Sequence, residues 1–304
     1  YPSVPKKMVV LNCVIATFLW VPGFFSNLFI VISSAIDIYM ERSLQPVEVL
    51  LAFNSLCNLA VCMLNFVMVL LLAFNFCPHI SLMFFWESSS GIQKWSASLV
   101  CMFFFFKILP MKNRVGLWLK SHFCMVLTCV FIVGCLSCFS TSVIDLFSEE
   151  WHNETSPQVS GNCSFTRLSR SLSVVKLVIK VVSYTSVLFL MIFPSGALMV
   201  HLVGHVRKMR GNMSEKNCAS QDGVTRAAFM IFFLSLEFIA CITARHVLSI
   251  IYENVFTHES VNSYCLANLI LTTIVPITLI AGINTLRWKA INLCTRTTLN
   301  DTNN

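Results

Sequence analysis

The stretch "WSASLVCMFFFFKILP", Trp95 to Pro110, places four consecutive phenylalanines directly before a lysine. Such an aromatic run fits the core of a soluble protein, a lipid-facing surface or the floor of a binding cavity. Consecutive residues of a helix face all directions, so we expect Phe103 to Phe106 to meet neighbouring helices and lipid alike. The place of Lys107 depends on whether the chain lies in water or in a membrane.

The composition indicates a membrane protein. Of the 304 residues, 56% are hydrophobic and 12% are charged, against about 45–50% and 25% in ordinary soluble domains. A soluble domain of this length needs more surface charge to stay dissolved. The net charge of +7 does not indicate nucleic acid binding, because the basic residues are spread between apolar runs.

Seven apolar stretches divide the chain. A helix needs about 20 apolar residues to cross the hydrocarbon core, and the third stretch reaches this length if it extends back to Trp86. We therefore expect an all-α, seven-transmembrane helix bundle that forms a single domain over residues 1–304. The expected spans are residues 9–36, 47–76, 86–109, 122–146, 174–203, 225–251 and 264–286.

The distribution of lysine and arginine predicts an extracellular amino terminus and a cytoplasmic carboxyl terminus, in a multi-pass protein of the plasma membrane. Lys107 then marks the cytoplasmic end of the third span, and Trp95 lies outward of it by roughly 18 Å. Two glycosylation sequons, at Asn153 and Asn162, fall in an expected outer loop and support this orientation. The expected inner face carries Lys107, Lys112, Arg114, Lys120, His205, Arg207, Lys208 and Arg210.

Most of the 14 cysteines lie inside apolar runs, where a thiol behaves as a small hydrophobe. Cys135 and Cys138 have CxxC spacing, but neither a second pair nor a nearby histidine completes a zinc site. Cys77, Cys163 and Cys265 fall in expected outer loops, which leaves room for at most one extracellular disulfide. We expect neither a metal nor a cofactor.

Several short segments resemble one receptor family. The stretch from Trp95 is similar to the third-helix signature of type 2 (bitter) taste receptors, W-x-A-T-x-L-S-x-F-Y-x-L-K-I-A. "GLWLKSHF" resembles the family's F-L-x-L-K segment, "HVRKM" its H-x-x-x-M and "SNLFIVI" its G-N-x-F-I. The resemblance implies a G-protein-coupled receptor that binds small, mostly apolar bitter compounds and activates a heterotrimeric G protein of the gustducin or Gi-like type.

The sequence also departs from this family. The arginine of the family's second helix is Asn58 here, and "IVPITLIAGIN" replaces the P-S-x-H-S of the seventh. The sequence has no D/E-R-Y after the third span and no N-P-x-x-Y in the seventh, unlike common rhodopsin-like receptors. A vomeronasal type 1 (pheromone) receptor is the alternative, although that family typically has a cysteine where "ESSSGIQKW" has none.

We expect the ligand in an outward-facing cavity between the helices. The resemblance implies that Trp95 forms one wall; an interfacial tryptophan is the alternative. Steps of three and four residues add Ser98 and Leu99 on the same face. Asn58 and Asn65 lie seven apart on the second span, so we expect Asn65 to face the cavity and Asn58 to bond to Asn27.

The sixth span adds three polar candidates for ligand contact, Arg245, His246 and Ser249, because polar groups within a span usually face the bundle interior. Arg245 has the alternative of reaching outward to the membrane surface. On the cytoplasmic side, the basic residues suit both anionic membrane lipids and the acidic parts of a G-protein α subunit.

Two other classes of membrane protein predict patterns that this sequence lacks. An enzyme needs several catalytic side chains at one depth, but the seven histidines are dispersed and no HExxH motif occurs. A transporter predicts internal repeats or paired broken helices. The receptor interpretation therefore remains the strongest.

Overall fold

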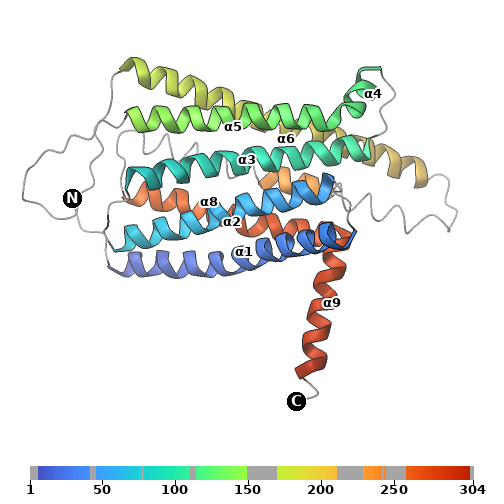
Figure 1. The fold of residues 1–304 in the computed structure, drawn as a ribbon, viewed down its shortest axis with the longest axis horizontal. Helices are drawn as coiled ribbons and strands as arrows, with labels where there is room; N and C mark the ends of the chain where they lie inside the picture. Colours follow the sequence, from blue (N-terminus) through green and yellow to red (C-terminus); the bar gives the residue numbers. More distant parts are fainter. Residues whose placement is uncertain are drawn as a thin grey trace, which may run out of the picture.

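The computed structural model describes residues 6–41, 46–74, 76, 79–109, 114–148, 170–210, 229–237, 239–240, 243 and 258–301. The elements in these ranges are α1 (Lys6–Glu41), α2 (Pro46–Ala73), α3 (Ile80–Ile108), α4 (Arg114–Ser121), α5 (Phe123–Ser148), α6 (Arg170–Arg210), α8 (His258–Gly282) and α9 (Asn284–Asp301). A further helical stretch, residues 229–237, belongs to the expected sixth span. The long helices lie side by side in a bundle, and α9 leaves it at a steep angle (Figure 1). Over these ranges the expected all-α bundle is confirmed.

Within the described ranges, five helices contain segments long and apolar enough to cross a membrane. These segments are Val10–Met40, Pro46–Ala73, Phe123–Ile144, Val181–His201 and Ser263–Gly282. They expose large apolar side chains on the outside of the bundle, such as Phe18 at 81% and Val200 at 76%. In water such surfaces are a liability, whereas in a membrane they meet hydrocarbon.

Helix α3 is the central helix of the bundle. It packs against α2, α5 and α6, and Figure 1 shows it in the middle of the view. Every residue from Gln93 to Phe106 is buried. A helix surrounded by protein needs no lipid-facing stripe, so α3 can carry Glu87, Lys94 and several serines.

This central position corrects the expectation for the phenylalanine run. Phe103 to Phe106 do not meet lipid, because each of the four side chains is less than 10% exposed. Phe103 packs edge-on against Phe104, and Phe106 packs against Phe123 of α5. The four rings point in different directions, but α3 has protein on every side at this depth.

Two helix boundaries differ from the expected spans. Helix α3 begins at Ile80 rather than near residue 86, where the His79 ring accepts a hydrogen bond from the Ser81 backbone N–H and caps the helix. The seventh helix ends at Gly282, and the chain restarts as α9 at Asn284. The expected span 264–286 therefore combines parts of two helices that run in different directions (Figure 1).

Candidate functional site

Three asparagines of α2, which we call the asparagine ladder, bind α3 through side-chain hydrogen bonds. Ser96 Oγ donates to Asn54 at 2.9 Å, Gln93 Nε2 to Asn58 at 2.9 Å and Trp86 Nε1 to Asn65 at 2.8 Å. All six side chains are buried. The partners run in opposite order along the two antiparallel helices, so the ladder fixes their register. Each such bond contributes about 0.6 kcal/mol on average within a membrane.

The predicted hydrogen bond between Asn58 and Asn27 is wrong, because each of the two side chains bonds to other residues. Asn27 Nδ2 donates instead to the carbonyl oxygens of Gly23, at 2.8 Å, and Thr272, at 2.9 Å, which ties α1 to α8. Asn58 bonds to Gln93 because α3 supplies a side-chain amide at the same depth. Asn65 lies further out on α2, and its side chain already bonds to Trp86 and to its own helix.

The two buried tryptophans of α3 face opposite sides of that helix. Trp86 and Trp95 are nine residues apart, which is about two and a half helical turns. Trp86 packs with Cys62, Met68 and other residues in one apolar cluster, whereas Trp95 belongs to a different cluster. The structure therefore does not bring Asn65, which bonds to Trp86, into one pocket with Trp95.

Trp95 lies in a crevice between α5 and α6. The crevice has a volume of about 520 Å³ and is lined by Trp95, Cys129, Val130, Val133, Thr185, Ser186, Phe189 and Leu190. The Trp95 side chain is 5% exposed, and its Nε1–H has no hydrogen-bond partner among the described residues. A buried donor without a partner costs about 1–3 kcal/mol.

Two glycines let α3 and α5 approach closely behind the crevice. A Cβ at Gly134 of α5 would lie 2.7 Å from Cγ and 2.8 Å from Cε3 of Trp95, and a Cβ at Gly91 of α3 would lie 3.1 Å from Cβ of Cys138. Gly91 lies four residues before Trp95 on α3, and Gly134 lies four residues before Cys138 on α5. Gly91 faces Cys138, and Gly134 faces Trp95. Small residues permit such contacts between membrane helices.

The remaining α3 candidates lie one turn further along the helix. Ser98 is 0% and Leu99 3% exposed, and the Ser98 hydroxyl donates to the backbone oxygen of Trp95 at 2.8 Å. Sequence reasoning missed Lys94, which is 4% exposed and whose Nζ lies 5.2 Å from the centre of the Tyr184 ring of α6. The sequence signal for this contact was a lysine within a span, which usually faces the bundle interior.

Several sequence candidates fall outside the described residues. Arg245, His246 and Ser249 of the expected sixth span, Lys112 and the sequon asparagines Asn153 and Asn162 are among them. His205, Arg207, Lys208 and Arg210 lie on the last turns of α6, whose backbone is described and whose side chains there are not. These candidates remain predictions.

The described part of the expected cytoplasmic face is basic. Lys107, Arg114 and Lys120 are all exposed, and Lys107 Nζ lies 5.9 Å from the centre of the Phe103 ring. Arg114 and Lys120 lie at the two ends of the short helix α4. Lys107, which follows the four phenylalanines in the sequence, is therefore exposed at the end of the buried part of α3.

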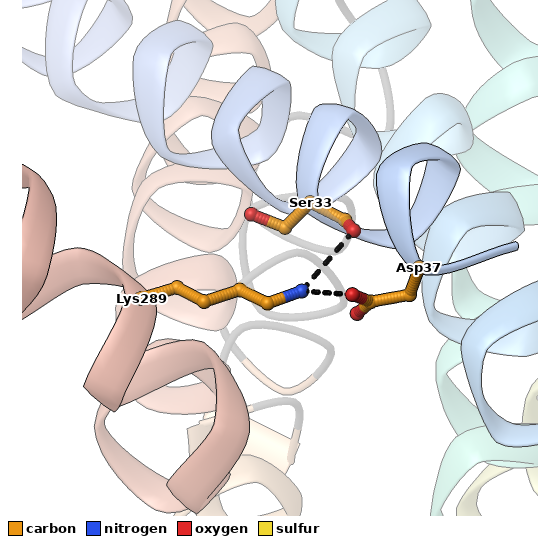
Figure 2. A network of polar contacts seen from close by, with 3 residues as sticks. All are labelled: Ser33, Asp37 and Lys289. Carbon is orange, nitrogen blue, oxygen red and sulfur yellow. Dashed lines mark hydrogen bonds and ion pairs between the residues drawn. The ribbon is translucent and has the colours of Figure 1, made fainter. Parts of the chain in front are cut away.

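Helix α9 is attached to α1 at the same end of the bundle. Lys289 of α9 forms an ion pair with Asp37 of α1, and its Nζ also donates to the Ser33 backbone oxygen at 3.4 Å (Figure 2). On the same helix, Trp288, Ile291 and Leu293 are exposed. These contacts connect the first turns of α9 to α1.

Removing the Lys289 charge should loosen α9. We expect Lys289→Met to lower the free energy of unfolding by at most about 1 kcal/mol, because both partners are partly exposed. Hydrogen exchange in α9 should rise, whereas the double exchange Asp37→Lys with Lys289→Asp should restore protection. Unchanged exchange in Lys289→Met would contradict an anchoring role for this ion pair.

The cysteines show no metal or disulfide site in the described residues. No three His, Cys, Asp or Glu side chains gather there as metal ligands would. Cys265, expected in an outer loop, is instead buried within α8, because that helix begins seven residues earlier at His258. Cys77 and Cys163 lie outside the described residues.

The comparisons with known proteins agree on the class of molecule. The fold is similar to that in the crystal structure of squid rhodopsin, with a TM-score of 0.70 and 12% identity, over 98% of this chain and 88% of that one. At this identity the likeness shows the seven-helix receptor fold alone. No curated protein matches the sequence. The model of the taste receptor protein (TAS2R) family, however, matches residues 4–297. The chain therefore belongs to the taste receptor (TAS2R) family, the bitter taste receptors among the G-protein-coupled receptors.

Proposed function

We propose that this receptor binds small, mostly apolar bitter compounds in an outward-facing cavity and activates a heterotrimeric G protein of the gustducin or Gi-like type at the plasma membrane. The observation that carries this proposal is the family match over residues 4–297. It favours a taste receptor over the vomeronasal alternative. It also favours a receptor over an enzyme or a transporter.

The proposed ligand site is built around α3. Trp95 offers a flat apolar surface and an unpaired donor, and an indole face can also bind a cation with about 0.5–2 kcal/mol. Ser98 and Leu99 support this wall from the next turn. Asn65 bonds to Trp86 on the opposite side of α3 and lies outside this wall. Arg245, His246 and Ser249 are proposed to contribute polar contacts from the sixth span.

The proposed G-protein surface is the basic end of the bundle. Lys107, Arg114 and Lys120 are exposed there, and Lys112, His205, Arg207, Lys208 and Arg210 are proposed to extend the same surface. Each cation near an anionic membrane surface contributes about 1 kcal/mol. The same charges suit acidic segments of a G-protein α subunit.

Ligand and G protein are proposed to communicate through a shift between two conformations of the bundle. A ligand shifts such an equilibrium only by the difference between its affinities for the two states. Helix α3 is suited to this role because it connects the Trp95 wall to Lys107 through a run of buried residues. An agonist that binds one arrangement of this wall better than the other would favour one arrangement of the inner end.

The proposal is tested in cells that express the chain at the surface together with a promiscuous or Gi-class G protein. We expect at least one compound in a chemically diverse bitter panel to raise intracellular calcium. The variant Arg114→Glu with Lys120→Glu should keep its surface level and ligand binding and lose most of the response. Silence of the wild-type chain across the whole panel, with the protein at the surface, would contradict the proposal.

A further inference from the structure

Helix α4 continues the lipid-facing surface of α5 at the basic end of the bundle. Backbone hydrogen bonds cross the junction, since the His122 N–H donates to the Trp118 oxygen and the Val126 N–H to the His122 oxygen, each at 3.0 Å. Steps of three and four residues join one exposed stripe along both helices. Its members are Trp118, His122, Met125, Cys129, Ile132 and Leu136. The last four lie in the apolar segment Phe123–Ile144, which is long enough to cross a membrane, so this stripe faces lipid.

Trp118 lies just beyond the hydrocarbon layer. It precedes the first residue of that apolar segment by five positions, which is about 7 Å along a helix, and the headgroup layer of a bilayer is about 5–7 Å thick on each side. The Trp118 ring is 53% exposed and stacks on the His122 ring, with the ring centroids 4.8 Å apart. Tryptophan is enriched at this layer because its ring is apolar and its N–H is polar. Trp118 therefore has both the position and the chemistry of an interfacial side chain.

The other side of α4 packs on the bundle. Gly116 is buried, and Leu119 packs against the aromatic cluster at the inner end of α3. Leu117 and Trp118, in contrast, are each more than half exposed, and α4 bends away from the axis of α5 (Figure 1). An apolar face that is continuous with a lipid-facing stripe is covered by the edge of the bilayer.

The charges of α4 define which lipid it meets. Arg114 and Lys120, at the two ends of the helix, are exposed, and residues 88–144 contain no aspartate or glutamate. A cation near an anionic membrane surface gains about fivefold in affinity. A G protein would approach these charges along the axis of the bundle, whereas Trp118 lies on the stripe that faces sideways into the membrane. This surface therefore fits anionic phospholipid.

We propose that α4 is an interfacial anchor that binds anionic phospholipids, with Trp118 in the headgroup layer and Arg114 and Lys120 beside the anionic headgroups. The inference rests on the membrane-spanning bundle, and it names a second partner for two cations of the proposed G-protein surface. It concerns lipid alone, so its tests need neither a bitter ligand nor a G protein.

The first test measures which lipids surround the full chain. Spin-labelled phosphatidylglycerol and spin-labelled phosphatidylcholine are compared in phosphatidylcholine vesicles that contain the purified receptor, and the ratio of their association constants gives the preference for the anionic lipid. We expect Arg114→Gln with Lys120→Gln to lower this preference by about twofold or more, since each lost cation weakens the attraction about fivefold at its own position. Added salt should lower the wild-type preference in the same direction.

Lys107→Gln is the matched control for the loss of charge. It removes an exposed cation from the end of α3, which lies at the centre of the bundle and packs against α2, α5 and α6. Lipid does not surround this helix, so the preference for the anionic lipid should stay at the wild-type value. All three cations are exposed, so the variants should keep the fold, which thermal unfolding checks.

The second test places Trp118 relative to the bilayer. Trp118→Phe keeps an aromatic ring beside His122, and subtracting its tryptophan fluorescence from that of wild type leaves the signal of Trp118. We expect lipids brominated near the headgroup to quench this signal more strongly than lipids brominated near the end of the acyl chain. Iodide in the water should quench it only weakly.

The outcomes separate this inference from the proposed function. A preference that stays unchanged in the double variant, or that falls as far in Lys107→Gln, would overturn the anchor and leave these cations to a G protein. A Trp118 signal that iodide quenches and brominated lipid does not would overturn it too, because α4 would then lie in water. Activation by bitter agonists is a separate measurement in each case. A preference lost in the α4 variants alone, together with quenching at headgroup depth, would support the anchor.

Discussion

Replacing Gly134 with valine should destabilise the folded receptor by about 3 kcal/mol, at the upper end of the usual range for overpacking a core. A Cβ at this position would lie within 2.8 Å of both Cγ and Cε3 of Trp95. The indole cannot move aside easily, because it is 5% exposed and packed in the largest apolar cluster. Either α5 must shift away from α3 or the ring must leave its place.

Thermal unfolding of the purified receptor measures this effect. Gly196→Val in α6 is the matched control, because a Cβ there has no neighbour within 4 Å. It should leave the melting temperature nearly unchanged. Trp95→Ala combined with Gly134→Val should cost clearly less than the sum of the two single changes, since the clash disappears with the ring. A melting temperature for Gly134→Val equal to that of the control would disprove the close packing.

Replacing Trp95 with alanine should reduce agonist potency by about tenfold to a hundredfold, because a fully buried aromatic side chain contributes up to about 3 kcal/mol. The loss should appear as a higher half-maximal agonist concentration in cells matched for surface expression. Trp288→Ala in α9 is the control, since that side chain is 65% exposed and far along the chain from the proposed site. Equal potency of wild type and Trp95→Ala would move the ligand away from this wall.

The helices themselves could be predicted from the sequence. Apolar runs of membrane-spanning length identify α1, α2, α5, α6 and α8 without reference to any tertiary contact. The third helix is different, since its polar residues face protein rather than lipid. The W-x-A and K-I pattern around Trp95 and Lys107 identified it, and the structure explains its composition by its central position.

Contacts between helices could not be predicted in the same way. Asn58 and Asn65 were correctly placed on one face, because a spacing of seven residues is nearly two turns. Which helix that face meets depends on tertiary packing, so the expected Asn27 partner was wrong and Gln93 is the partner found. For the same reason the sequence grouped Asn65 with Trp95, although Asn65 bonds to Trp86 on the opposite side of α3.

The helix after the bundle had only a weak sequence signal. Residues 284–301 are polar on average, and the apolar members Trp288, Ile291 and Leu293 are few. Asp37 and Lys289 are 252 residues apart, so no local pattern joins them. Without knowledge of this ion pair, the sequence predicts only a short tail after the last membrane span.

The most direct test of the central claim is guanine-nucleotide exchange by a purified Gi-class heterotrimer, with the receptor in lipid discs and a bitter agonist identified in cells. We expect the agonist to accelerate exchange with the wild-type chain, and we expect Trp95→Ala to need about ten to a hundred times more of it for the same rate. If the wild-type receptor is folded and the agonist does not raise the exchange rate above its basal value, the result would contradict the account of this chain as a bitter receptor that signals through a G protein.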